Sequence, residues 1–258
     1  TSTLADYLIE HRIVGVDSLD TRALTRHIRN TGAMRAIIST SELNPEKLVE
    51  KAKALPSMAG LDLAKTVTSD RPYHWQNNQP NPIEGKLDQG VWRQRGKKPS
   101  VVAIDFGIKY NILRCLASHD LEVVVVPAYT DAETIKAMAP SGIFLSNGPG
   151  DPAAVPYVVE TVQTLLGKVP IFGICFGHQI IAKALGGVVD FHPVSLEVGT
   201  KEIQLLETGQ KDLLFRGMPD RFRAHVFHSQ SIRKLPERAV VLAKNSFNRI
   251  NAEVRQRL

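Results

Sequence analysis

The chain has 258 residues, of which 43% are hydrophobic and 22% charged. This composition is typical of a globular protein and excludes a largely disordered chain, a collagen-like fibre and a coiled coil. No run of about 18 apolar residues occurs, so the sequence offers no transmembrane helix. The net charge of +6 comes from 32 Lys and Arg residues scattered among 26 acids. A nucleic-acid interface needs a basic face with interleaved aromatic residues, and the scattered charges of this sequence form no such face. We therefore expect no nucleic acid as a partner, and the lack of a long apolar run argues against a membrane as well.

The N-terminus and the cysteines bear on the compartment. The first residues show no basic segment followed by an apolar one, so we expect no signal peptide. Only two cysteines occur, Cys115 and Cys175. They provide neither a disulfide framework nor the spacing of a metal site, which fits a reducing cytoplasm and a protein without a metal. Cys115 lies in an apolar helical pattern and is expected in the core.

Residues 1–66 are predicted to form a partial small α/β domain. Each of its expected helices begins after a capping residue: Thr3, Asp20 and Asn44. Gly32 can end the second helix, and the apolar residues 36–39 are expected to form a short strand.

Residues 67–100 are predicted to be a linker, because prolines and polar residues interrupt every apolar period there. Trp75 and Trp92 are expected to pin this stretch to the surface of a domain. The densest basic cluster, at 93–98, also falls here and is typical of a solvated loop.

From residue 101 the chain alternates between apolar strands and amphipathic helices. The expected strands are 101–105, 121–127, 143–146 and 169–174, and the expected helices are 111–117, 131–138, 155–166 and 177–185. This order predicts an α/β fold with an open, mostly parallel sheet flanked by helices. After residue 188 the pattern is β-rich, with strands expected at 202–206 and 239–243. Ligands of such folds bind beyond the carboxyl ends of the strands.

Two unusual turns follow neighbouring strands of this pattern. One is Asn-Gly-Pro-Gly-Asp-Pro at 147–152, and the other is Gly-Ile-Cys-Phe-Gly-His-Gln at 173–179. Gly-x-Cys-x-Gly between a strand and a helix is the cysteine form of a nucleophile elbow, in which glycines relieve crowding. Cys175 would project at a helix N-terminus, which favours the thiolate, and the amide of Phe176 could stabilise an oxyanion. The alternative interpretation is a buried structural cysteine with glycines for packing.

Both turns resemble those of the class I (triad) glutamine amidotransferase domain. In addition, the segments 13–26, 32–34, 60–63 and 105–114 resemble the family of small, glutamine-hydrolysing subunits of carbamoyl phosphate synthetases. The resemblance extends from the start of the chain to about residue 186. It implies a flavodoxin-like amidotransferase domain at 101–258 that is incomplete at its C-terminus.

The resemblance also implies a reaction. Glutamine would bind against a set of residues from both turns: Gly148, Gly150, Phe176 and Gln179. Cys175 would attack the side-chain amide, release ammonia and leave a γ-glutamyl thioester for water to hydrolyse. In the family the ammonia passes to a large synthetase chain, which makes carbamoyl phosphate for pyrimidine and arginine synthesis. No Gly-x-x-x-x-Gly-Lys-Ser/Thr loop occurs here, so this chain would need no cofactor, and ATP and Mg would belong to the partner.

Beyond residue 186 the sequence departs from this family. The last third of the chain looks more like free-standing class I amidotransferase-like proteins. At the other end, the sequence is expected to start inside the family's N-terminal domain. In the free-standing proteins, Ser229 and Gln230 would approach the amino-acid end of the substrate. These features leave two alternatives open: a free-standing γ-glutamyl hydrolase or amidotransferase-like protein, and a catalytically impaired truncated or hybrid chain with a binding role.

The most serious departure from the family concerns the general base of the reaction. The family places a His two residues before a Glu near its C-terminus, and these 258 residues contain no such motif after Cys175. His192 is followed by a proline but lacks the carboxylate. His225 and His228 are spaced like a metal pair without a third ligand and are expected at the surface or the substrate rim. His178 adjoins the elbow and is expected to pack or to bond locally. Because a general base contributes about 100- to 10,000-fold, we expect weak or no glutaminase turnover from this exact chain.

Overall fold

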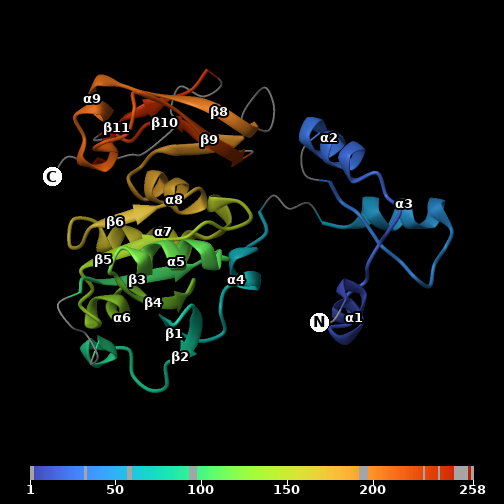
Figure 1. Ribbon diagram of the computed structural model, residues 1–258, viewed down its shortest axis with the longest axis horizontal. Coiled ribbons are helices and arrows are strands. Elements are labelled where there is room, and N and C mark those ends of the chain that lie inside the picture. Colours follow the sequence, from blue (N-terminus) through green and yellow to red (C-terminus); the bar gives the residue numbers. More distant parts are fainter. Residues whose placement is uncertain are drawn as a thin grey trace.

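The computed structural model describes residues 3–31, 34–56, 60–92, 98–191, 197–228, 230–237, 239–246 and 255–256. Figure 1 shows a sheet flanked by helices, a second β-rich layer beside helix α8, and a group of N-terminal helices that lie to one side. Among the described residues, no helix combines the length and the apolarity that crossing a membrane requires.

The N-terminal helices begin where the sequence predicts. They are α1 (Leu4–Glu10), α2 (Thr21–Thr31) and α3 (Pro45–Ala54). The predicted caps are confirmed: Thr3 Oγ1 accepts from the amide of Asp6, Asp20 Oδ1 from Ala23, and Asn44 Oδ1 from Lys47. Gly32 lies outside the described residues.

The same region lacks a core of its own. Between residues 3 and 56, no described residue is buried. The strand expected at 36–39 is wrong, since described residues 34–39 have no regular secondary structure and belong to none of the sheets that the structure describes. An apolar run becomes a strand only when a neighbour completes its hydrogen-bond ladder.

The predicted α/β fold is confirmed. One six-stranded sheet has the order β2-β1-β4-β3-β5-β6, in which the last four strands are parallel. These parallel strands are β3 (Ser100–Asp105), β4 (Glu122–Pro127), β5 (Gly142–Leu145) and β6 (Ile171–Gly173). The helices that alternate with them are α5 (Tyr110–Ser118), α6 (Ala132–Ala137), α7 (Pro156–Leu165) and α8 (Phe176–Ala184). A short 3-10 turn, η2 (Pro152–Ala154), precedes α7.

Helices cover both faces of the sheet, and strand β4 shows why. Val124 and Val126 pack with the side chains of α6, α7 and α8, whereas Val123 and Val125 point to the other face and pack with Leu113 of α5. Alternate residues of a strand face opposite sides, so a strand that is apolar throughout needs a cover on each. Burial of each such side chain stabilises the fold by about 1.5–3 kcal/mol.

Cys115 contradicts its expected place in the core. Helix α5 buries Leu113, and Cys115 is exposed. Two residues further along a helix correspond to a rotation of about 200°, which turns the thiol to the opposite side.

The stretch predicted as a linker contributes to the sheet domain. It contains β1 (Tyr73–Gln76), β2 (Gln79–Pro82) and the 3-10 turn η1 (Gln89–Trp92), and the short helix α4 (Ala64–Val67) crosses its expected start. Strand β1 pairs antiparallel with β4, and Trp75 and Trp92 are each only 4% exposed. The two tryptophans therefore anchor this stretch, as expected. Prolines are tolerated in β2 because it is an edge strand. The boundaries at 66 and 100 stay a prediction.

The C-terminal third is β-rich, as predicted. Its strands are β7 (Val188–Phe191), β8 (Glu197–Leu205), β9 (Arg221–His228), β10 (Gln230–Lys234), β11 (Ala239–Val240), β12 (Ala243–Lys244) and β13 (Arg255–Gln256), and its short helical turns are α9 (Glu207–Gln210) and η3 (Leu213–Phe215). The strand expected at 202–206 is the end of the longer β8, and that expected at 239–243 is divided between β11 and β12. Strands β12, β8 and β9 form one sheet over a small core that includes Ile203 and Leu242.

Candidate active site

The turn at Cys175 has the geometry of a nucleophile elbow. Cys175 joins β6 to α8 as the N-cap residue, with φ 51° and ψ −108°. A positive φ is strained for a residue with a side chain and persists only where the surroundings impose it. The residue is exposed. The strand, the sharp turn and the helix thus present the thiol at the carboxyl end of the parallel sheet.

Two glycines make this turn possible. A Cβ on Gly173 would lie 2.5 Å from the carbonyl carbon of Gly177, and a Cβ on Gly177 would lie 2.2 Å from the carbonyl oxygen of Leu145 in β5. Neither position can hold a side chain without moving backbone. The prediction that both glycines relieve crowding is therefore confirmed. The alternative, a buried structural cysteine, is not confirmed, because Cys175 reaches the surface.

The second Gly-rich turn lies beside the first. Strands β5 and β6 pair in parallel with Leu145 opposite Gly173, so the turns that follow them leave the same edge of the sheet. A Cβ on Gly148 would lie 2.6 Å from Phe106, and Gly150 has φ 96°. The ring of Phe106 also meets that of Phe176 with centroids 5.4 Å apart. Phe106 thereby packs against both turns.

The electrostatic surroundings of Cys175 are mixed. Neighbouring protein atoms desolvate the thiol and raise its pKa even though the residue is exposed, while the positive charge of Lys109 acts in the opposite direction. The net pKa is raised. The helix N-terminus is expected to lower the pKa of the thiol, whereas desolvation raises it. Lys109 lies inside the segment 105–114 that carried the family resemblance, but sequence reasoning gave it no role.

The structure brings Gln179 and Gln230 together. Gln179 is 9% exposed, and its Nε2 donates a hydrogen bond of 2.9 Å to the backbone oxygen of Gln230. This bond ties α8 to the start of β10. Phe176 is 2% exposed, so only its backbone is suited to contact a substrate. Ser229 lies outside the described residues. Substrate contacts of these residues stay predictions.

The histidines separate into different environments. His225 contacts Thr200 across β8 and β9 and is exposed, as expected. His178 is half-buried, and desolvation, with a smaller effect of His228, lowers its pKa to about 4, so its imidazole is neutral near pH 7. Its Nε2 has no hydrogen-bond partner in the described part of the chain. No group of three metal-ligating side chains occurs among the described residues.

His228 belongs to a polar cluster that the sequence did not reveal. Its Nε2 lies 2.9 Å from Oε2 of Glu197, whose side chain is fully buried, and Asn245 donates to the other carboxylate oxygen. Burial alone would raise the pKa of Glu197, but the contacts with His228 and Asn245 outweigh it and hold the pKa below its ordinary value. His228 is therefore held on the β8–β9 pair rather than free at a rim.

Replacement of Glu197 by glutamine is expected to destabilise the protein by about 1–3 kcal/mol at pH 7, because a buried charged contact is lost. The pKa of Glu197 is lowered on folding, so its contribution is present above its ordinary value of 4.5 and disappears as the pH falls through the folded-state pKa. Urea unfolding of both proteins from pH 7 to pH 3 measures the difference. Glu202→Gln is the control, since Glu202 pairs with Arg221 at the surface of the same strand. A difference for Glu197→Gln that does not shrink toward pH 3 would contradict the charged contact.

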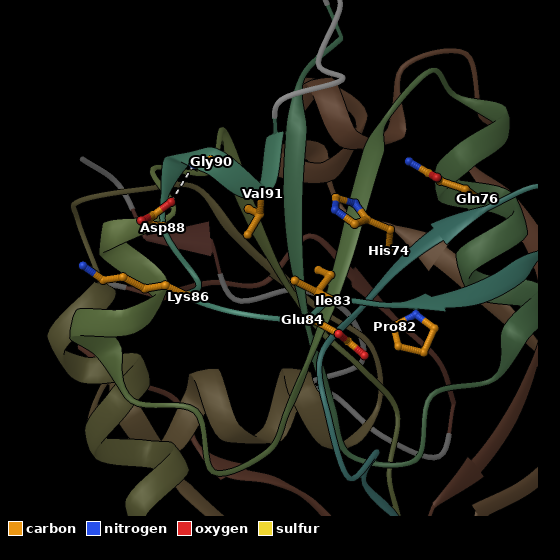
Figure 2. A pocket seen from close by; sticks show the side chains of 9 residues that line it. All are labelled: His74, Gln76, Pro82, Ile83, Glu84, Lys86, Asp88, Gly90 and Val91. Atoms are coloured by element: carbon orange, nitrogen blue, oxygen red, sulfur yellow. Dashed lines mark hydrogen bonds between the residues drawn. The ribbon is translucent and has the colours of Figure 1, made fainter.

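A cavity of ≈ 430 Å³ lies elsewhere on the domain. It is lined by His74, Gln76, Pro82, Ile83, Glu84, Lys86, Asp88, Gly90 and Val91 (Figure 2). Strands β4, β3 and β5 separate β1 from β6 in the sheet. No residue of the two Gly-rich turns lines this cavity, so the surroundings of Cys175 remain the candidate active site.

Comparison with known proteins agrees with this geometry. The chain is 52% identical over 202 residues to the carbamoyl phosphate synthase small chain of Syntrophotalea carbinolica, which corresponds to 77% of this chain and 51% of the relative. It is 52% identical over 188 residues to the small chain of a Synechococcus species, covering 71% of this chain and 46% of the relative. The chain spans about half the length of the curated relatives that it matches.

A solved structure shares the fold. A Thermoplasma acidophilum protein, provisionally assigned as one chain of a GMP synthase, superimposes with a TM-score of 0.53 at 21% identity, covering 59% of this chain and 76% of that one. The family model "Carbamoyl-phosphate synthase small chain, CPSase domain" matches residues 1–38. The model "Glutamine amidotransferase class-I" matches residues 102–257, which include both turns and all four parallel strands from Val102 onward. With the elbow at Cys175 inside that match, the chain belongs to the class I glutamine amidotransferase family.

Proposed function

We propose that this chain hydrolyses the side-chain amide of glutamine and supplies the ammonia for the synthesis of carbamoyl phosphate. The observation that carries the proposal is the strained elbow at Cys175, exposed at the carboxyl edge of the sheet. The relatives named carbamoyl phosphate synthase small chain support the destination of the ammonia.

The chemistry follows from the position of the thiol. The sulfur of Cys175 attacks the amide carbon, the carbonyl oxygen becomes an oxyanion, and the C–N bond breaks as the nitrogen takes up a proton and leaves as ammonia. Water then cleaves the thioester and regenerates the thiol with glutamate. The amide of Phe176 opens α8, where the first amides of a helix have no acceptor within it, so it can donate to the oxyanion.

The proposal assigns the remaining parts of the system to a partner. Glutamine is the substrate of this chain, which uses no cofactor of its own, and a large synthetase chain uses ATP and Mg. We place the reaction in the cytoplasm. The free-standing hydrolase alternative predicts turnover of γ-glutamyl compounds without any partner.

Glutamine hydrolysis is expected to be slow for the isolated chain, because no general base is evident, and to increase about tenfold with a carbamoyl phosphate synthase large chain, within the usual range of coupling between sites. The increase is expected because a partner can order the substrate loops. Ammonia release from glutamine, with γ-glutamyl-p-nitroanilide as the competing substrate, measures it. Ammonia release that responds to no large chain, together with rapid turnover of the anilide, would favour the free-standing hydrolase and overturn this proposal.

A further inference from the structure

A segment from the N-terminal half lies over the loops of the candidate site. We call residues 60–70, which include α4, the strap. The position that a Cβ would take on Gly150 is 3.5 Å from Leu63 Cβ, and that on Gly107 is 3.0 Å from Val67 Cγ2. The strap therefore packs directly on the turn at 147–152 and on the loop after β3.

One buried carboxylate joins the strap to that loop. Asp105 ends β3 and is 4% exposed. Its Oδ1 accepts hydrogen bonds of 2.8 Å from the amides of Gly107 and Ile108, and its Oδ2 accepts one of 2.9 Å from the amide of Ser69 in the strap. Hydrogen bonds to a charged acceptor are among the stronger ones in proteins, so this carboxylate fixes both segments relative to the sheet.

The same loop is hydrogen-bonded to the turn at 147–152. The amide of Lys109 donates to Asn147 Oδ1 at 3.3 Å, and Asn147 Nδ2 donates to the oxygen of Gly107 at 3.0 Å. The loop at 107–109 and the turn at 147–152 are thus bonded to each other. Lys109 is also the cation whose charge lowers the pKa of Cys175 against the effect of burial.

The strap is anchored at further points. The hydroxyl of Tyr157 in α7 donates a hydrogen bond of 2.9 Å to Asp62 Oδ2. Thr68 Oγ1 accepts a hydrogen bond of 2.9 Å from the amide of Ala128. The strap is also the chain connection between residues 3–56 and the sheet domain. If the N-terminal helices move, the strap is the part of the chain that transmits this movement to the sheet domain.

We propose that Asp105 is a positioning residue of the glutaminase site, through which the strap holds the loop at 107–109, the bearer of Lys109, against the turn at 147–152. The proposal rests on the proposed function of Cys175. Asp105 itself does not react: it acts through the loop, and the strap sets the place of that loop.

Alkylation of Cys175 by iodoacetamide tests this, because the reagent reacts with the thiolate and requires no glutamine. In Asp105→Asn one side-chain oxygen is replaced by an NH2 group, which cannot accept from Ser69. We expect the rate at pH 7 to fall about threefold, as the pH profile shifts by roughly half a unit to higher pH. Loss of a nearby negative charge alone would make the thiolate easier to form and would speed the reaction. The sign therefore separates positioning from a direct effect of the charge.

A double-mutant cycle identifies the route. If Asp105 acts through Lys109, Asp105→Asn is expected to change the alkylation rate by less than about 1.5-fold in a Lys109→Met background. Asp131→Asn is the control, since Asp131 caps α6 with a similar hydrogen bond to Thr134 and lies outside this network. All variants carry Cys115→Ser, so that only Cys175 is alkylated.

Ser69→Pro is a second variant that leaves every charge in place. It removes the amide from which Asp105 accepts, together with the Ser69 hydroxyl, which has no hydrogen-bond partner among the described residues. Thr68 already has the extended backbone, φ −65° and ψ 154°, that a residue before proline adopts. We expect Ser69→Pro to slow alkylation of Cys175, as Asp105→Asn does. If Asp105→Asn does not fold, Ser69→Pro alone tests the proposal. An unchanged or faster rate in a folded variant, or an equal effect with and without Lys109, would overturn the proposal. Failure of glutamine hydrolysis with the cycle intact would instead overturn only the proposed function.

Discussion

In the presence of a carbamoyl phosphate synthase large chain, Cys175→Ser is expected to lower glutamine hydrolysis by at least about 1,000-fold, the scale of losing a catalytic nucleophile. It is also expected to abolish covalent labelling by 6-diazo-5-oxonorleucine, a glutamine analogue that alkylates the attacking group. A serine hydroxyl has nearly the shape of the thiol, but it remains protonated at neutral pH and is a far weaker nucleophile without a base. Ammonia release and the mass of the intact protein after labelling measure the two effects.

Cys115→Ser is the matched control for this experiment. Cys115 is the other cysteine of the chain, and it is exposed on α5. It is therefore open to nonspecific alkylation but belongs to neither of the two Gly-rich turns. We expect this variant to retain one adduct per chain, at Cys175. An adduct that persists in Cys175→Ser but disappears in Cys115→Ser would show that the nucleophile has been misassigned.

The sequence was sufficient for the parallel sheet because its strands are apolar throughout. Four consecutive valines in β4 need cover on both faces, and only helices between strands provide it. The elbow was equally accessible, since Gly173, Cys175 and Gly177 have a spacing that crowding alone explains. Both features depend on residues close together in the chain, where periodicity and turn chemistry carry the information.

Features that depend on distant partners were not predictable. Strand β1 pairs with β4, which lies about fifty residues away, and nothing in its polar, proline-rich surroundings indicates that neighbour. The contact of Glu197 with His228 likewise exists only because β8 and β9 pair in one particular register. Asp105 was visible in the motif of the family, but its bond to Ser69 depends on the path of the strap.

Gly177→Ala is expected to destabilise the protein by about 3 kcal/mol or more, which is the range of severe overpacking. Alanine normally stabilises a helix relative to glycine by about 1 kcal/mol, so helix propensity alone predicts the opposite sign. The added methyl group would lie 2.2 Å from the oxygen of Leu145 and 2.6 Å from its Cβ. Backbone has to move, either by lifting α8 from β5 or by displacing the strand itself. Urea unfolding monitored by circular dichroism measures the loss.

Gly142→Ala separates this clash from a general effect of removing glycine. Gly142 begins β5, the strand that Gly177 contacts, but a Cβ there would meet only the oxygen of Pro170, at an ordinary 3.7 Å. We expect a change within about 1 kcal/mol, the span of strand propensities. Because α8 carries Cys175 at its first turn, any rise of the helix also moves the thiol relative to the turn at 147–152. A folded Gly177→Ala protein is therefore expected to lose labelling at Cys175 as well, whereas wild-type stability in that variant would mean that α8 does not rest on β5 and that the elbow is built differently.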